Sequence, residues 1–173
     1  MLACVVSGGQ TGVDRAALDA AMAVGIPCGG WCPAGRRSED GRIPPQYPLQ
    51  ETDARSYAVR TRLNVRDSDG TLILVLNEIS NGTRLTIDAA RQEQKPCLVE
   101  YLLPEKSAGL VVAENSTEQQ LATVVDWMRR HRIRILNVAG PRGSSDSSVY
   151  PLARAFLAQL LEQLNSPAID QSA

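Results

Sequence analysis

Short apolar runs alternate along the chain with longer stretches whose apolar residues recur at helical spacing. The run Thr71-Leu72-Ile73-Leu74-Val75-Leu76 is nearly continuous, as expected for a strand that is covered on both faces. The apolar runs predict strands over residues 2–7, 26–30, 71–76, 97–102 and 133–139, and a small extra strand over residues 110–113. The periodic stretches predict helices over residues 12–24, 53–66, 83–94, 116–131 and 149–164.

This order of elements predicts an α/β fold, because strands that alternate with helices form a parallel sheet with helices on both faces. We expect a Rossmann-like three-layer αβα arrangement with a doubly wound, mainly parallel sheet of about five strands. Right-handed crossovers place all the strand-to-helix loops at one edge of such a sheet. We interpret residues 1–165 as a single domain and the polar residues 166–173 as a flexible C-terminal tail.

The first strand-to-helix turn, Gly8-Gly9-Gln10-Thr11-Gly12, has the composition of an anion cradle. Glycines let backbone N–H groups approach a ligand, and the following helix supplies unpaired donors and the positive end of a dipole. Two similar turns, Asn81-Gly82-Thr83 and Gly140-Pro141-Arg142-Gly143-Ser144, follow later strands. Ligands of doubly wound sheets bind at the carboxyl edge, where strand order reverses, so we expect the three turns to form one site.

Side chains near these turns suit a phosphate group. Hydroxyl groups of Thr11, Thr83 and Ser144 can donate to phosphate oxygens. The guanidinium of Arg142 can bind the same oxygens bidentately. The alternative interpretation is that glycine serves only the geometry of three tight turns.

Residues 31–52 carry many prolines and glycines and no strand or helix periodicity. A loop of this length without regular structure is uncommon inside a compact domain and is often functional. It forms either a solvated surface loop or a lid over the first glycine turn. We favour the lid, because Trp31 and Tyr47 are large aromatic residues that a solvated loop would leave unused. In this interpretation Trp31 and arginines such as Arg36 cover the ligand.

Composition and charge narrow the classes of partner. The chain has 173 residues, a formal net charge of −1 and 21% charged residues. This balance argues against broad binding to nucleic acid or to an anionic membrane surface. No apolar run approaches the roughly 20 residues that span a bilayer, and no basic segment with an apolar signal region opens the chain. We therefore expect a cytoplasmic protein.

The sequence lacks the motifs of several other binding and catalytic sites. The Gly-Lys-Ser/Thr motif of nucleoside triphosphatases is missing, and the first turn does not read Gly-x-Gly-x-x-Gly. Four cysteines and a single histidine, His131, form neither a zinc pattern nor a catalytic triad, so we expect no metal site. The carboxylates have structural alternatives, because Asp14 can stabilise a helix start and Asp67 and Asp69 can shape a turn.

Four motifs resemble the family named putative molybdenum carrier proteins, a circularly permuted YpsA-like branch of the SLOG superfamily. The motifs are Ser-Gly-Gly-Gln-Thr-Gly-Val-Asp-Arg-Ala-Ala-Leu-Asp at 7–19, Gly-Gly-Trp-Cys-Pro-Ala-Gly-Arg-Arg-Ser-Glu-Asp-Gly at 29–41, Asn-Val at 64–65 before Asp-Ser-Asp-Gly-Thr at 67–71, and Asn-Val-Ala-Gly-Pro-Arg at 137–142. The resemblance extends to about residue 150. The superfamily includes molybdenum cofactor carriers and LOG-type nucleotide phosphoribohydrolases.

The resemblance implies a Rossmann-like SLOG-type domain that binds a phosphate-bearing ligand, either the molybdenum cofactor (molybdopterin) or a nucleotide-like molecule. It also implies a homo-oligomer, a dimer or a tetramer. Together with the three turns, it gives an expected ligand and phosphate site made of Gly8, Gly9, Gln10, Thr11, Gly12, Asp14, Arg15, Trp31, Arg36, Gly82, Thr83, Thr86, Gly140 and Arg142.

One departure separates this chain from the LOG-type enzymes, which use a Gly-Gly-x-Gly-Thr-x-x-Glu turn with a catalytic glutamate and a partner arginine. The comparable turn here reads Asn81-Gly82-Thr83-Arg84-Leu85-Thr86, so that Thr86 stands at the glutamate position. A carboxylate is the usual group for N-glycosidic cleavage, and its absence favours a binding or carrier protein without an assigned catalytic residue. Two alternatives stay open, a nucleotide hydrolase that uses Asp14, Glu39 or Asp40, and a nucleotide-sensing protein.

Overall fold

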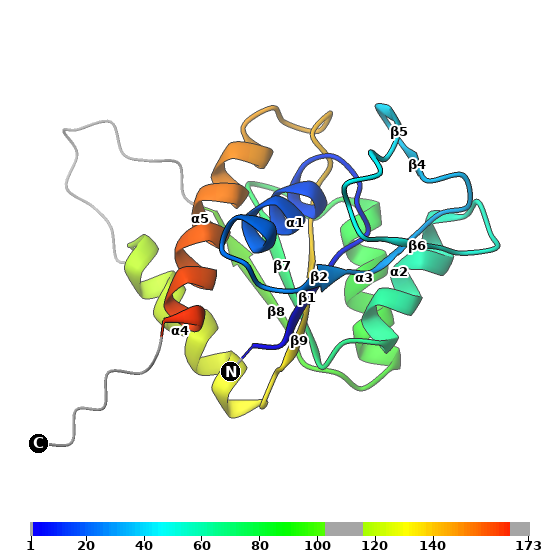
Figure 1. Ribbon diagram of the computed structural model, residues 1–173. Helices are drawn as coiled ribbons and strands as arrows, with labels where there is room; N and C mark the ends of the chain where they lie inside the picture. Colours follow the sequence, from blue (N-terminus) through cyan, green and yellow to red (C-terminus); the bar gives the residue numbers. More distant parts are fainter. Residues whose placement is uncertain (1, 103–115, 167–173) are drawn as a thin grey trace, which may run out of the picture.

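The computed structural model describes residues 2–102 and 116–166, and its centre is a five-stranded parallel sheet (Figure 1). The strands stand in the order β2-β1-β9-β7-β8. Their bounds are β1 Cys4–Val6, β2 Cys28–Gly29, β7 Gly70–Val75, β8 Cys97–Tyr101 and β9 Ile135–Ala139. Every pair of neighbouring strands is parallel. The sequence prediction of a doubly wound Rossmann-like fold is therefore confirmed.

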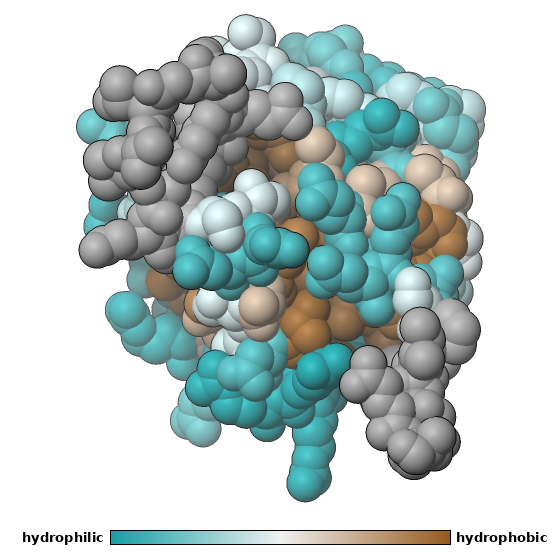
Figure 2. All heavy atoms as spheres, turned by 90° about the vertical axis from the view of Figure 1, so that its left-hand side faces the viewer, coloured by the Kyte–Doolittle hydropathy of each residue, from teal (hydrophilic) through white to brown (hydrophobic). Residues whose placement is uncertain are grey.

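Five helices cover the two faces of the sheet (Figure 1). Their bounds are α1 Val13–Ala23, α2 Tyr57–Arg66, α3 Asn81–Gln92, α4 Thr117–Arg130 and α5 Val149–Asn165. Helices α1, α4 and α5 lie on one face, where they bury the larger apolar core, and α2 and α3 lie on the other. On the face formed by α4 and α5, polar side chains stand out and apolar ones show between them (Figure 2). All six residues of β7 are buried, as the continuous apolar run predicted.

Local hydrogen bonds explain two helix starts that differ from the prediction. Helix α3 begins at Asn81 rather than at residue 83, because the Ser80 hydroxyl caps it by accepting from the Thr83 N–H at 3.2 Å. Helix α2 begins at Tyr57 rather than at residue 53. The residues before it are held outside the helix, since the Ala54 carbonyl accepts hydrogen bonds from the backbone of Ala34 and the hydroxyl of Thr52.

The prediction that residues 31–52 lack regular structure was wrong. Strand β3, Trp31–Cys32, pairs in parallel with β6, Gln50–Glu51. Strand β4, Arg37–Ser38, forms an antiparallel hairpin with β5, Gly41–Arg42. These ladders are only two residues long, too short to show any periodicity in the sequence. The segment packs on Leu18 of helix α1 in a small second core that also contains Cys32, Ile43, Tyr47 and Leu49.

Two sequence predictions lie outside the described residues, namely the strand over 110–113 and the tail beyond residue 166. Within the described ranges, no helix is both long enough and apolar enough to cross a bilayer.

Candidate ligand-binding site

The three glycine turns meet because the strands that precede them are neighbours. Strand β9 stands between β1 and β7, and all three end at the same edge of the sheet. The first and third turns touch, since the Gly143 N–H donates to the Thr11 hydroxyl at 3.1 Å and the Val13 N–H donates to the Pro141 carbonyl at 3.2 Å. Gly12 has a φ of +79°, and a Cβ there would collide with the Pro141 carbonyl oxygen. Glycine is therefore required for this close approach.

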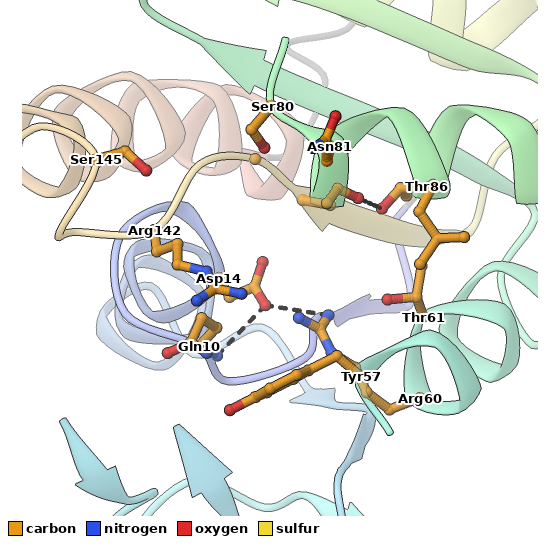
Figure 3. A pocket seen from close by; sticks show the side chains of 14 residues that line it. Gln10, Asp14, Tyr57, Arg60, Thr61, Ser80, Asn81, Thr86, Arg142 and Ser145 are labelled. Atoms are coloured by element: carbon orange, nitrogen blue, oxygen red, sulfur yellow. Dashed lines mark hydrogen bonds and ion pairs between the residues drawn. The ribbon is translucent and has the colours of Figure 1, made fainter. Parts of the chain in front are cut away.

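A cavity of about 270 Å³ opens between the three turns and helix α2 (Figure 3). Its lining consists of Gln10, Asp14, Tyr57, Arg60, Thr61, Ser80, Asn81, Gly82, Leu85, Thr86, Ala139, Gly140, Arg142 and Ser145. The predicted residues that it brings together are Gln10, Asp14, Gly82, Thr86, Gly140 and Arg142. The position at which strand order reverses thus carries the cavity, as expected for this class of sheet.

Charged groups inside the cavity are paired but not balanced. The Asp14 carboxylate lies 3.2 Å from the Arg60 guanidinium, and the two side chains are 4% and 13% exposed. Burial raises the pKa of Asp14 above its ordinary value, against the opposing effects of Arg60 and a hydrogen bond from the Gln10 N–H. The Arg142 guanidinium lies 5.6 Å from the centre of the Tyr57 ring. Among the residues that line the cavity, two guanidinium groups therefore stand against one carboxylate, while the Glu39 carboxylate outside the lining also feels the charge of Arg142.

Two buried donors in the lining have no hydrogen-bond partner in the part of the chain that the structure describes. They are Gln10 Nε2 and Arg60 Nε. Leaving a buried donor unpaired costs roughly 1–3 kcal/mol, so such groups are rare in folded proteins. Both groups are donors, so the chemistry that would satisfy them is a ligand with acceptor oxygens.

Sequence reasoning missed the contribution of helix α2, which supplies Tyr57, Arg60 and Thr61 to the cavity. Positions three and four apart lie on one face of a helix. A signal was present, because Thr61 and Asn64 are polar residues on the buried side of this helix. Gly8, predicted as part of the cradle, lies against Arg60 of helix α2. A Cβ at Gly8 would collide with the Arg60 guanidinium, so the glycine makes room for that side chain.

The structure places Arg36 and Trp31, which we expected to cover the ligand, outside the residues that line the cavity. The Arg36 guanidinium donates to the carbonyl oxygens of Ile43, Pro44, Tyr47 and Leu49 at 2.9–3.1 Å, which fixes the loop. These carbonyls belong to irregular backbone and need a donor. The Trp31 indole N–H donates to the Asp67 carboxylate at 2.8 Å, and neither Arg36 nor Trp31 lines the cavity.

The backbone of the first turn is closed rather than open to a phosphate. The Gln10 N–H donates to the Asp14 carboxylate at 3.3 Å, and the Thr11 N–H donates to Gln10 Oε1 at 3.0 Å. Gly9 packs against the loop, since a Cβ there would meet Leu49. Arg15 also faces the loop and binds Asp40 through both terminal nitrogens, at 2.5 and 2.8 Å.

Thr83 is buried outside the cavity, where its hydroxyl lies 3.0 Å from the Ser80 hydroxyl. The Thr86 hydroxyl donates to the Gly82 carbonyl at 3.3 Å while its side chain lines the cavity. Among the described residues, no group of three His, Cys, Asp or Glu side chains has the arrangement of a metal site.

The order of strands and the cavity at their carboxyl edge define a Rossmann-like α/β protein of the kind that binds ligands at that edge. A family comparison makes the assignment specific, because the model of the circularly permutated YpsA SLOG family matches residues 5–161. The chain belongs to this family, as the four sequence motifs indicated.

The chain is also similar to a solved structure, the "Putative molybdenum carrier protein" from Syntrophus aciditrophicus SB. The two are 41% identical, with a TM-score of 0.81 over 95% of this chain and 96% of that one. A comparison with curated proteins gave no match.

Proposed function

We propose that the chain is a binding and carrier protein for a phosphate-bearing ligand, which enters the cavity between the three turns. One observation carries the proposal, namely that Gln10 Nε2 and Arg60 Nε are buried in the lining without partners among the described residues. A phosphate supplies the acceptor oxygens that these donors lack. Its charge also opposes the two guanidinium groups of the lining, which contains one carboxylate.

The ligand we propose is the molybdenum cofactor or a nucleotide-like molecule. The carrier named in the similar structure supports the first choice. Arg60, Arg142 and Gln10 would hold the phosphate, and a cavity of about 270 Å³ has room for little more than this end of the ligand. An adjoining hollow of about 470 Å³ shares Ser80 and Ser145 with the cavity and gives the remaining part of the ligand a place.

A carrier has to hold its ligand without reacting with it, and the cavity lining suits this requirement. The position of the LOG-type catalytic glutamate holds Thr86, whose hydroxyl is bonded to the Gly82 carbonyl. Of the residues that line the cavity, Asp14 is the only acidic one. Its carboxylate is paired with Arg60, an arrangement that fixes the cation for binding.

Native mass spectrometry of the anaerobically purified protein tests the proposal directly. We expect a co-purified molecule that carries phosphate, and we expect inorganic phosphate to bind to the emptied protein in a calorimetric titration. Arg60→Gln should abolish phosphate binding, because it removes a cation and one of the orphan donors. Arg62→Gln is the matched control, since Arg62 is exposed on the same helix. Equal binding by both variants would remove the cavity from consideration.

A second candidate function, nucleotide hydrolysis, is favoured by the position of Asp14. Its carboxyl group lies in the cavity, and burial raises its pKa, as is common for a general acid. Glu39 and Asp40 are outside the lining. Release of free base from nucleoside monophosphates, lost in Asp14→Asn, would establish hydrolysis. Binding of the same nucleotides without release would establish a carrier.

A further inference from the structure

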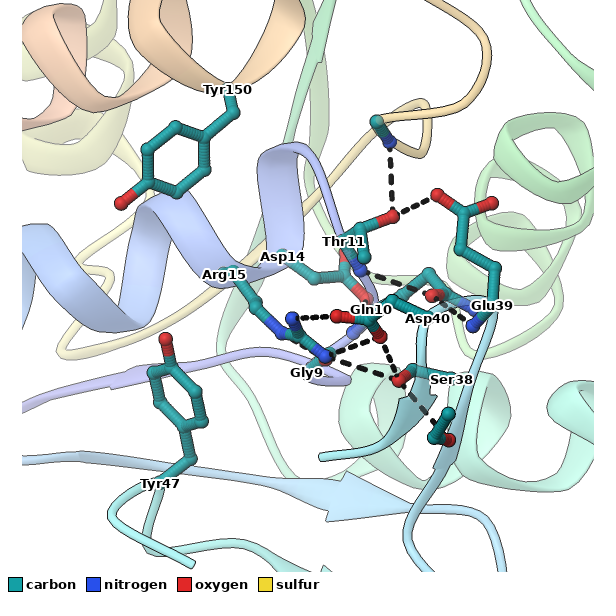
Figure 4. A network of polar contacts seen from close by, with 12 residues as sticks. Gly9, Gln10, Thr11, Asp14, Arg15, Ser38, Glu39, Asp40, Tyr47 and Tyr150 are labelled. Carbon is teal, nitrogen blue, oxygen red and sulfur yellow. Dashed lines mark hydrogen bonds and ion pairs between the residues drawn. The ribbon is translucent and has the colours of Figure 1, made fainter. Parts of the chain in front are cut away.

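The tip of the β4–β5 hairpin rests on the first and third glycine turns (Figure 4). Glu39 forms this contact. One of its carboxylate oxygens accepts from the Thr11 hydroxyl and from the Ser144 N–H at 3.0 Å. The other accepts from the Ser144 hydroxyl at 2.5 Å. Three donors therefore converge on one carboxylate.

This donor set is the kind that binds a phosphate group. Hydroxyl and backbone N–H groups form charge-assisted hydrogen bonds with carboxylates and phosphates alike. Although burial acts in the opposite direction, hydrogen bonds from Ser144 and Thr11 and the charge of Arg142 hold the pKa of Glu39 below its ordinary value. The site thus prefers a negatively charged occupant.

The Glu39 contact adjoins the cavity through two pairs of consecutive residues. Thr11 binds Glu39, while Gln10 lines the cavity. Ser144 binds Glu39, while Ser145 lines the cavity. The Gln10 amide itself joins the two places, because its oxygen accepts from the Glu39 N–H at 2.9 Å and its buried nitrogen is the orphan donor described above.

We propose that Thr11 and Ser144 form a second anion subsite beside the cavity, which the Glu39 carboxylate fills in place of a ligand group. The ligand class is then a diphosphate, with one phosphate against Arg60 and Arg142 and the next against Thr11 and Ser144. Glu39 is exposed, so its side chain has solvent to move into when the second phosphate enters. This inference rests on the proposed function, because the first phosphate occupies the cavity.

Calorimetric titration with pyrophosphate and with orthophosphate separates the two subsites. Glu39→Gln keeps the shape of the side chain and removes the competing charge, so pyrophosphate should bind about tenfold more tightly than to the natural chain. The gain for orthophosphate should be much smaller, because one phosphate reaches only one subsite. Adding Thr11→Val, which removes the donor hydroxyl, should cancel most of the gain. Asp53→Asn controls for charge alone, since it removes an exposed carboxylate from the segment that follows β6.

Several outcomes would overturn the second subsite. One is a pyrophosphate affinity of Glu39→Gln that equals or falls below that of the natural chain, which would make Glu39 a structural tie. Another is an equal gain for both probes, which would make Glu39 a general charge near the cavity. The thermal unfolding midpoints of Glu39→Gln and Glu39→Ala, compared with that of the natural chain, show whether a substitution at this position causes a folding defect. The proposed function survives either result if orthophosphate still binds and Arg60→Gln abolishes this binding. It fails together with the second subsite if the natural chain and Glu39→Gln bind neither probe.

Discussion

The carboxylate of Asp14 lies 3.2 Å from the guanidinium of Arg60 inside the cavity. Asp14 belongs to α1 and Arg60 to α2, two helices that cover opposite faces of the sheet. The ion pair therefore joins the two helical layers at the carboxyl edge. It also fixes the cation that we assign to the phosphate, so the stability of the fold and the binding of a ligand depend on the same contact.

Arg60→Gln should lower the free energy of unfolding by roughly 3–5 kcal/mol, because it leaves a buried carboxylate without its partner. The unpaired charge is relieved when Asp14 takes up a proton. Its pKa in the folded state is raised, so the penalty is fully developed above that pKa and shrinks as the pH falls toward the ordinary value of 3.8. Urea unfolding from pH 4 to pH 8 measures this dependence. An equal loss at all pH values would show that packing, rather than charge, explains the defect.

The contact between Asp40 of the β4–β5 hairpin and Arg15 should lose stability as the pH falls, whereas the penalty of Arg60→Gln should shrink. Hydrogen bonds from Arg15 and Ser38 lower the pKa of Asp40 to about 2. Stability from a carboxylate with a lowered pKa is complete above its ordinary pKa of 3.8 and is lost as the pH falls toward 2. The Asp40 side chain is 45% exposed, so we expect a contribution of no more than about 1 kcal/mol.

Asp40→Asn removes this pH-dependent contribution. Urea unfolding should show that the variant loses less stability than the natural chain between about pH 4 and pH 2. Asp53→Asn, at an exposed residue that follows β6, serves as the control and should lose as much as the natural chain. If Asp40→Asn and the natural chain have parallel profiles, the contact with Arg15 does not stabilise the hairpin.

The contact between the first and third turns can be tested with two glycines of similar conformation. Gly12 has a φ of +79° and Gly25 a φ of +72°, but a Cβ at Gly12 would collide with Pro141 whereas Gly25 has open space. Gly25→Ala should cost about 1–2 kcal/mol, the strain of a left-handed alanine. Gly12→Ala should cost clearly more and weaken phosphate binding, because it forces the two turns apart. Equal losses would mean that the turns tolerate separation.

Most of the fold could be predicted from the sequence, and six of the predicted site residues line the cavity. Alternating runs such as residues 71–76 predicted the sheet, because covered parallel strands are continuously apolar. The prediction that the three glycine turns lie at one edge of the sheet was correct, because their positions follow from chain order and crossover handedness. Helix α2 was harder, because Arg60 lacks any local motif and reaches the cavity only through packing. Homo-oligomerisation stays a prediction.

Arg36 shows why the structural role of some polar residues could not be predicted from the sequence. In the sequence it is one of several arginines in a long polar segment. Its actual partners are carbonyl groups spread over residues 43–49, and no local pattern reveals such pairs. A loop with little strand structure leaves its carbonyls without partners, and the half-buried Arg36 guanidinium, with its several N–H groups, satisfies four of them at once.

Arg142 should distinguish phosphorylated from dephosphorylated ligands. Its guanidinium lines the cavity beside Tyr57, and the carboxylate in the lining, Asp14, is paired with Arg60, so Arg142 can bind an anion there. Arg142→Ala should weaken the binding of a nucleoside monophosphate by about tenfold or more, since a charge-assisted hydrogen bond contributes roughly 1.5–3 kcal/mol. Binding of the matching nucleoside should change little. Arg154→Ala, at an exposed position on α5, removes the same charge away from the cavity and should leave both affinities unchanged. Equal losses for nucleotide and nucleoside in Arg142→Ala would show that this side chain contacts the base or sugar and not the phosphate.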